Sequence, residues 1–399
     1  MADFKTQFNP ADPTIISGQR AVTDENSTRV KADVSEEIFQ YDPNANSLTL
    51  LMTKLRSRRS VSQYLFHWLE KDRQPRFTKV ATGATAAQTA TMVVTASDGG
   101  KLFPRALIVN IDTGERALVT SVSTDTPTLV RGIGSEGAFP MTAGDRIEII
   151  GSAYEEGADV GSSRTVQTRN VEQYTQIIRT PIAFTGRDEN TDMYGGNDKM
   201  TERKWIAVEH AISIEKAFWW SRKHSAVMTG DDKYTTYMNG IDSYCDDNEW
   251  DLNGVPFTER SFTEYLEYAM RRGKGGKMGR RQKFLFCAPR FVTELESMAR
   301  DRLQVLPSSE VFGLEVTAFK SSHGKVMLIE HPLFEDRGDI AFLIDMNHVK
   351  YVYHQGRDTK LLENRGGNGV DGTTEEYLSD VAIQFELSEA HGRISRLPL

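Results

Sequence analysis

Short runs of alternating apolar and polar residues fill the chain between 84 and 150. The runs ATMVVTASD, ALIVNID, RALVTSVS, PTLVRGI and DRIEIIG follow one another at close intervals, with Gly, Asp and Pro between them. Alternation with a period of two predicts strands, and the residues between the runs favour turns. The pattern therefore predicts a small all-β module, near the lower size limit for a domain that folds alone.

The most regular helical pattern lies at 197–224. Asn197 and Asp198 are candidates for capping its N-terminus. Its apolar residues share one wide face, which comprises Trp205, Val208, Ala211, Ile212, Ile214, Phe218 and Trp219. One such face predicts that the helix lies across a sheet. Trp219 and the adjacent Trp220 point to different sides, so we expect one of them to meet a second surface.

Two extended segments flank the β module. The segment 60–80 alternates until Glu70, where it becomes wholly charged, and 164–187 is extended and rich in Thr and Gln. The module is therefore predicted to be an insertion between an outgoing strand and a returning strand. Before them, 46–58 has the spacing of a short amphipathic helix. The residues on its apolar face are Leu48, Leu51, Met52 and Leu55.

The C-terminal half combines helices with runs of strands. Helices are predicted at 261–273 and 289–306, the second with Pro289 in its first turn, where the missing N–H is harmless. A buried strand lies between them at 282–288, four more strands follow within 311–357, and the chain closes with the strand EEYLSDVAIQFELSEA. Runs of strands with a few long helices, without strict alternation, predict the α+β class.

Composition limits the classes to which the protein can belong. The 399 residues carry a formal net charge of −8, so the chain as a whole is not built to bind nucleic acid or an anionic membrane. It has no apolar run of about 18 residues, which argues against a membrane-spanning helix. The two cysteines, Cys245 and Cys287, fit a reducing compartment. Residues 1–45 are polar and weakly patterned, which is typical of an arm that orders on docking or of a disordered tail.

Motifs for catalysis or cofactor binding are missing from the sequence. Its eight histidines form no His-Glu-x-x-His pair, and it has no Cys-x-x-Cys. His348 and His354 flank one predicted strand, which favours ordinary strand histidines over a metal pair. The segment 367–372 fits Gly-x-Gly-x-x-Gly but follows no buried strand, so we predict a loop. The acidic run 246–251 is predicted to be an exposed turn, and we expect no catalytic, metal or cofactor site.

A basic, glycine-rich stretch follows the helix predicted at 261–273. Its cations are Arg271, Arg272, Lys274, Lys277, Arg280, Arg281 and Lys283. Met278 stands where a phosphate-binding loop needs its second glycine, and no aromatic residues interleave to stack on bases. A solvated loop is the favoured interpretation, and contact with an acidic surface of another subunit is the alternative.

Four segments carry a resemblance to a known family. NVEQYTQIIRTPIAFTG comes first, followed by VEHAISIEKAFWW, YMNGIDSY and LFCAPRFVTEL. Each segment alone is of low specificity, but their order resembles that of tailed-phage major capsid proteins with the Hong Kong 97-type fold. The resemblance covers residues 46–399 and implies an α+β capsid fold into which the small all-β domain is inserted.

The resemblance also implies a division of the chain. Its outer parts would be an N-terminal arm at 1–45, an extended β-hairpin (E-loop) region at 46–83 and 151–190, and the inserted domain at 84–150. Its central parts would be the long spine helix with the peripheral domain at 191–245, the axial domain at 246–345, and strands returning to both at 346–399. Assembly surfaces are then expected on the arm, the hairpin and the helix.

The function implied by the resemblance is self-assembly without catalysis. Pentamers and hexamers of the chain would form in the host cytoplasm and tile the icosahedral head of the virion around double-stranded DNA. We expect contacts between subunits at Glu70, Lys71, Asp72, Arg73, Arg76, Trp219, Trp220, Arg271, Arg272, Lys274, Arg280 and Arg281. Exposed ion pairs are worth about 0–1 kcal/mol each, so many would have to act together.

The expected partners follow from the same resemblance. They are other copies of the chain, scaffold, portal and decoration proteins, and packaged DNA that the inner face touches without sequence specificity. No cofactor and no membrane partner are expected.

Two other classes stay open at this point. A phage structural or adhesin module would use the 84–150 domain to bind a glycan or a protein. A hydrolase or nuclease would have catalytic residues scattered along the chain, with His348 and His354 as the first to test. The lack of clustered histidine and carboxylate motifs makes the enzyme the weakest of these classes.

Overall fold

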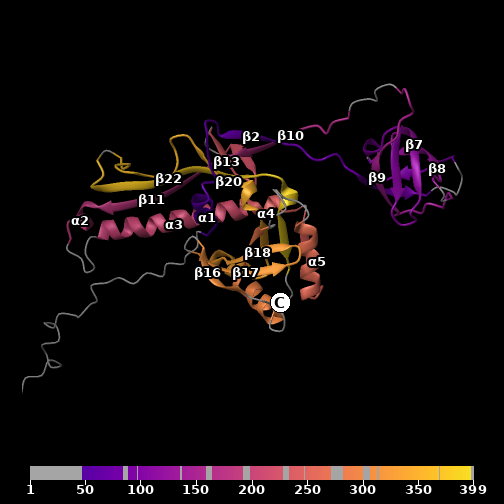
Figure 1. Ribbon diagram of the computed structural model, residues 1–399. Helices are drawn as coiled ribbons and strands as arrows, with labels where there is room; N and C mark the ends of the chain where they lie inside the picture. The colour runs from indigo at the N-terminus through magenta and orange to yellow at the C-terminus, as the bar shows by residue number, and fades with distance from the viewer. Residues whose placement is uncertain are drawn as a thin grey trace, which may run out of the picture. The chain divides into compact units, whose positions relative to one another are not determined.

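A computed structural model describes most of the chain after the predicted arm (Figure 1). It describes residues 47–83, 89–96, 98–134, 137–158, 164–191, 198–227, 233–246, 248–270, 282–299, 306–311, 314–367 and 369–396. The predicted arm and most of the predicted basic loop lie outside these residues. The chain divides into a small unit, His67–Glu172, and a main unit that combines the residues up to Phe66 with Gln173–Leu399.

The small unit is a closed β-barrel with the strand order β4-β8-β7-β6-β9-β3-β5. The strands are β3 (Phe77–Thr82), β4 (Thr89–Thr91), β5 (Val93–Val94), β6 (Ala106–Asn110), β7 (Arg116–Ser123), β8 (Thr126–Arg131) and β9 (Arg146–Ser152). Only Met92 separates β4 from β5 in the chain, so the two ends of this order meet and the sheet closes on itself. Closure leaves no terminal strand in this seven-stranded sheet.

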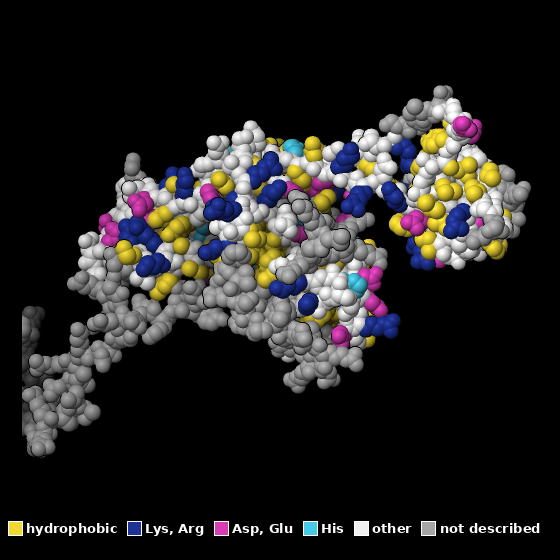
Figure 2. All heavy atoms as spheres, in the orientation of Figure 1, with side chains coloured by type: hydrophobic (Ala, Val, Ile, Leu, Met, Phe, Trp, Pro, Cys, Tyr) yellow, Lys and Arg dark blue, Asp and Glu magenta, His cyan; other side chains and the backbone are white. Residues whose placement is uncertain are grey.

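Alternation along the strands fills the barrel with apolar side chains. The core consists of Val80, Met92, Val94, Leu102, Ala106, Ile108, Ala117, Val119, Leu129, Met141, Ile147 and Ile149. Figure 2 shows that hydrophobic side chains also lie on the outside of the barrel, where Phe77, Phe139 and Tyr154 are exposed. The period-two pattern read from the sequence is therefore the inside–outside alternation of a barrel wall.

A buried ion pair fixes one side of the barrel. The Arg131 guanidinium donates through Nε to Glu115 Oε1 at 2.8 Å, and both side chains are fully buried. The same carboxylate accepts a hydrogen bond from Phe139 N at 3.1 Å, and Arg131 donates to the Phe139 carbonyl. Each charge is matched by its partner and by backbone groups, which is the condition under which burial of an ion pair is tolerated.

The barrel begins before residue 84. Strand β3 pairs with β5 and β9, although the sequence assigned it to the outgoing hairpin. The single strand predicted at 60–80 is wrong. Exposed residues at 62–64 separate β1 (Arg58–Val61) from β2 (Leu65–Glu70), and the exposed charged segment 71–76 separates β2 from β3. The returning segment likewise splits into β10 (Arg169–Tyr174), which pairs with β2, and β11 (Gln176–Thr185).

The first sheet of the main unit carries the long helix α3 (Asp198–Trp220). Its order is β1-β20-β22-β11, and a further strand pairs with β22. Of its strands, β20 comprises Val349–His354 and β22 comprises Gly372–Phe385, and the further strand is β21 (Lys360–Leu362). β11 and β22 pair antiparallel from Gln176↔Val381 to Thr185↔Gly372. The helix α3 lies along this ladder (Figure 1), as its single apolar face predicts.

The second sheet of the main unit has the order β14-β23-β19-β15-β18-β17-β16. Its strands are β14 (Glu249–Asp251), β15 (Gln282–Cys287), β16 (Leu306–Val311), β17 (Leu314–Ser321), β18 (Gly324–Glu330), β19 (Ala341–Ile344) and β23 (Gly392–Ser395). Helices α5 (Glu259–Met270) and α6 (Pro289–Ala299) pack on it through a core that includes Phe262 and Phe291. The buried strand and the helix-starting proline predicted from the sequence are confirmed.

Two interpretations of this sheet need correction. The acidic run 246–251 is not a turn throughout, because Glu249–Asp251 forms β14 and pairs parallel with β23. The sequence predicted neither β16 nor β23. The pairing of β14 with β23 joins residues more than a hundred positions apart, such as Trp250↔Ile394, which no local pattern signals.

Short elements complete the main unit. They are α1 (Ser47–Lys54), α2 (Gly186–Glu189), α4 (Ile241–Tyr244), β12 (His224–Val227), β13 (Tyr234–Tyr237) and the 3-10 helices Pro332–Arg337, Met346–His348 and Ser388–Ala390, while Gly99–Lys101 is a 3-10 helix of the small unit. Leu48, Leu51 and Met52 of α1 are buried as predicted, whereas Leu55 lies past the end of the helix and is exposed.

Candidate functional site

Trp219 lies in the core of the main unit, at the end of α3. It is 0% exposed, and its ring packs edge-to-face against Phe286 and Phe334 at centroid distances of 5.2 and 4.8 Å. The expectation that Trp219 contacts another subunit is therefore wrong, because it joins α3 to the second sheet and has no surface left. Trp220 is half-buried, and the Arg337 guanidinium lies 3.9 Å from the centroid of its ring.

The turn after α3 is held by the strands that precede the helix. Gln173 of β10 donates a hydrogen bond to Asn239 O and accepts one from Asn239 N, both at 2.9 Å. Gln176 of β11 accepts from Met238 N at 3.3 Å. The segments NVEQYTQ and YMNGIDSY, noted separately in the sequence, thus form one structural unit.

A buried carboxylate holds α1 against α3. Glu215 is 0% exposed and accepts hydrogen bonds from Leu48 N at 2.8 Å and Thr49 N at 3.0 Å. The Nε2 atom of His331 lies 3.1 Å from Glu215 Oε1 and 3.2 Å from Trp219 Nε1. The carboxylate therefore caps the first turn of α1, whose N–H groups lack helical partners. The sequence gives no local sign that Glu215 has this role, because its partners lie far away in the chain.

Two adjacent glutamates of β22 bind cations from neighbouring segments. Arg203 of α3 donates through Nε to the buried Glu375 at 2.6 Å, and this bond lowers the pKa of the Glu375 carboxyl although burial opposes the shift. The buried Glu376 pairs with Arg179 of β11 at 2.8 Å and with Arg365 at 3.1 Å. These contacts fasten α3 and β11 to β22, so they serve the fold of the subunit itself.

Glu70 is also used within its own subunit. It is 8% exposed and accepts hydrogen bonds from Trp68 Nε1 at 2.9 Å and Arg169 Nη2 at 2.6 Å. The pairing of β2 with β10 brings Arg169 beside it. The expectation of an ion pair with another subunit at Glu70 is therefore corrected to an internal one.

The segment between β2 and β3 does present charge to solvent. Lys71, Asp72, Arg73 and Arg76 are all exposed, and Lys71 Nζ donates to Thr165 Oγ1 at 3.3 Å. Within the described part of the chain, Asp72, Arg73 and Arg76 have no ion pair. These three residues have the exposure that a contact with another subunit requires.

The predicted basic loop falls at the junction of α5 and β15. Arg271, Arg272, Lys274, Arg280 and Arg281 lie outside the residues that the structure describes. Lys283, which the sequence grouped with them, is buried in β15, and its ammonium donates to Ala269 O at 2.7 Å and to Ala390 O. Because Ala269 belongs to the last turn of α5, Lys283 supplies a cation where the helix dipole favours one.

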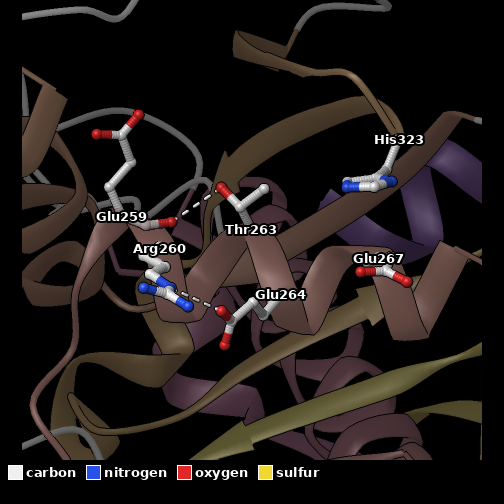
Figure 3. Close-up of a pocket in the computed structure, with 6 residues that line it drawn as sticks. All are labelled: Glu259, Arg260, Thr263, Glu264, Glu267 and His323. Atoms are coloured by element: carbon white, nitrogen blue, oxygen red, sulfur yellow. Dashed lines mark hydrogen bonds and ion pairs between the residues drawn. The ribbon is translucent and has the colours of Figure 1, made fainter.

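The outer face of α5 borders a hollow of about 370 Å³. Figure 3 shows the residues that line it, which are Glu259, Arg260, Thr263, Glu264 and Glu267 of α5 and His323 from the turn between β17 and β18. Arg260 Nε donates to Glu264 Oε1 at 2.9 Å. Three carboxylates against one guanidinium leave this face acidic.

The described residues contain little that suggests catalysis. None of their His, Cys, Asp and Glu side chains gather in groups of three or more that could hold a metal ion. Burial raises the pKa of the Cys287 thiol, which disfavours the nucleophilic thiolate. Among the same residues, no helix has the length and apolar character needed to cross a membrane.

Comparison with solved structures defines the class of protein. The capsid of a native GTA particle matches with a TM-score of 0.51 and 10% sequence identity, over 95% of this chain and 100% of that chain. At this identity the likeness shows the fold alone. The fold is that of the Hong Kong 97-type capsid proteins, in the α+β class, as the resemblance of the four segments implies.

Comparison of sequences identifies the family. A family model described as SU10 major capsid protein matches residues 14–398. The major capsid protein of Pseudomonas phage PaMx41 is 26% identical over 301 residues, which span 73% of this chain and 71% of that protein. The chain belongs to the SU10 major capsid protein family. It is a major capsid protein of a tailed phage, and its place in the virion is the capsid.

Proposed function

We propose that this capsid protein forms its lattice through the exposed charges between β2 and β3, together with Arg271, Arg272, Lys274, Arg280, Arg281 and Trp220. The observation that carries the proposal is the unpaired, exposed state of Asp72, Arg73 and Arg76 within the described part of a capsid subunit. A shell repeats each contact many times, so individually weak ion pairs act together through multivalency.

Expression of the full chain, followed by electron microscopy and sedimentation, tests this function. Capsomers or uniform shells of megadalton mass are expected. The triple variant Asp72→Ala/Arg73→Ala/Arg76→Ala should assemble poorly, whereas Arg73→Lys/Arg76→Lys, which keeps the charges, should assemble well. A wild-type chain that stays monomeric at high concentration would contradict the function, and normal assembly of the triple variant would contradict the assigned contacts.

The remaining partners belong to the same proposal. Scaffold, portal and decoration proteins are expected to bind the assembled lattice, and packaged DNA to touch its inner face without sequence specificity. The net charge of −8 supports a shell that encloses DNA without binding it tightly. DNA released from purified particles by moderate salt, with no sequence enrichment, is the expected result. Retention of one sequence would argue for a specific site.

The chain is further proposed to catalyse no reaction. Membership of a major capsid protein family supports this. Incubation of the purified protein with DNA or RNA and divalent metals should leave the nucleic acid intact. Cleavage by the wild type that is lost in His348→Ala or His354→Ala would instead support the hypothesis that the chain is a nuclease.

A further inference from the structure

Charges of opposite sign follow one another in the sequence at the end of α5. Three carboxylates, Glu259, Glu264 and Glu267, lie along the outer face of α5 and line the hollow beside it. His323 lines the opposite side of this hollow (Figure 3). The segment that follows directly, 271–281, reads RRGKGGKMGRR and has six cations and no carboxylate. A helix face and the next segment of the chain are thus complementary in charge.

We propose that the acidic face of α5 in one subunit is the docking surface for residues 271–281 of a neighbouring copy of the chain. The inference rests on the proposed self-assembly and deepens it, because it names the two surfaces that meet. The occupant of the hollow beside α5 is then a second copy of this chain.

Ring symmetry requires such a pair of surfaces. In a ring of identical subunits every contact is heterologous, so one patch of the chain must fit a different patch of the next copy. Two patches of the same sign would repel each other, whereas an acidic face and a basic segment attract and also fix the register of the contact. The α5 face and residues 271–281 provide one acidic and one basic patch in every subunit.

The surface of α5 is suited to receive arginine. Tyr268, one residue after Glu267, is 56% exposed, although α5 buries Phe262 and Leu266 on its other side. A guanidinium can bind carboxylates through its N–H groups and an aromatic ring through its face. The ion pair between Arg260 and Glu264 is exposed, with side-chain accessibilities of 89% and 62%, so an incoming cation can replace Arg260 readily.

The subunit itself does not need the cations of 271–281 at the end of the helix. Lys283 already donates to the carbonyl of Ala269 in the last turn of α5. The charge that this helix end favours is therefore supplied from inside the subunit, by a buried lysine of β15. The cations of the preceding segment are better explained by an acidic surface outside the subunit.

Charge reversal and its rescue test the contact. One variant carries Glu264→Lys and Glu267→Lys, and a second carries Arg280→Glu and Arg281→Glu. Each alone should give at least tenfold fewer particles than the wild type in sedimentation, because like charges then face each other. Glu330→Lys is the matched control, since it reverses an exposed carboxylate of β18 that does not line the hollow beside α5, and it should assemble normally.

Co-expression of the two variants separates a contact between copies from one within a copy. In a hexamer that alternates the two variants every contact is again complementary, so hexamers should return, whereas a ring of five subunits cannot alternate. If only the chain with all four substitutions is rescued, the contact lies within one chain and the inference is overturned. Normal assembly of both single-patch variants overturns it as well. Equal urea midpoints of the unassembled variants establish that folding is unchanged.

The wild type distinguishes this inference from the function on which it rests. If the wild type forms no particles, the proposed self-assembly fails and the inference fails with it. If the wild type forms particles and the charge-reversed variants do so equally well, the docking surface alone is refuted.

Discussion

The carboxylate of Glu215 accepts a hydrogen bond from the backbone N–H of Leu48 at 2.8 Å, across 167 positions of the sequence. Thr49 donates to the same carboxylate through its N–H and its hydroxyl. The short helix α1 is therefore tied to α3 at its first turn, where the chain leaves the predicted arm. The tie is buried, so water cannot replace it without opening the core.

Replacing Glu215 with Gln should loosen α1. The amide group keeps one acceptor oxygen but presents an NH₂ to groups that donate, which leaves a buried donor unpaired. We expect a loss of about 1–3 kcal/mol in the free energy of unfolding, measured by urea titration of the unassembled subunit. Hydrogen exchange at Leu48 and Thr49 should accelerate. Glu209→Gln, on the exposed side of the same helix, is the control and should change neither measurement.

Replacing Glu115 with Gln should destabilise the barrel alone. The change leaves the guanidinium of Arg131 buried without its counter-charge, which costs about 3–5 kcal/mol. Exchange at barrel amides such as that of Val119 should accelerate, while amides of the main unit such as that of Ile383 should keep their rates. Replacement of both Glu115 and Arg131 by Met should cost less. Equal acceleration in both units would show that they do not unfold separately.

Acid should weaken the subunit before its carboxylates titrate. Burial lowers the pKa of His210, which lies between Thr180 Oγ1 and Ser379 Oγ, and lowers that of His391 well below its usual range. The unfolded chain therefore binds more protons than the folded one just below the ordinary value of 6.5. The contribution of these histidines to the free energy of unfolding is complete above this pH. Below it, the free energy of unfolding falls by up to about 1.4 kcal/mol per pH unit for each histidine. Urea titrations of the wild type and of His210→Gln measure this, and an equal pH slope in both would contradict the role of His210.

Replacing Gly240 with Ala should strain the turn after α3. A Cβ at this position would lie 2.8 Å from backbone atoms of Ser221 and Trp219, which cannot move independently of the helix end. We expect a loss of about 1–3 kcal/mol, as for other overpacked sites. Gly367→Ala is the control, because no atom lies within 4 Å of the added carbon. Equal melting temperatures for the two variants would contradict the close packing of this turn.

Local patterns in the sequence were sufficient where burial depends on nearby residues. The apolar face of α3, the buried strand β15 and the helix start at Pro289 all follow from spacing and turn chemistry over a few residues. The alternation that predicted the inserted β domain likewise reflects residues that face inward and outward along single strands. Order along the chain, with these elements in place, was enough to suggest the capsid fold.

Such local patterns could not predict which distant segments of the chain pair with one another. Glu70 stands in a charged run, yet its partner Arg169 lies 99 positions away, so composition could not show that the carboxylate is buried. Lys283 ends a basic run, yet it points into the core because β15 starts there. Trp219 was placed on the apolar face of its helix, but the sequence did not show that the second sheet encloses it. These three errors arose where a charged or aromatic side chain meets a distant element.

The closed barrel of the small unit bears on how a shell can tolerate this domain. A shell brings many copies of the domain to a high local concentration, and a free strand edge on each copy would invite one barrel to hydrogen-bond to the next. Closure of β4 and β5 onto the rest of the sheet removes that route to fibrous aggregation for the seven-stranded barrel sheet. Substitutions on the outer wall can then alter what each barrel binds without turning neighbouring barrels into one continuous sheet.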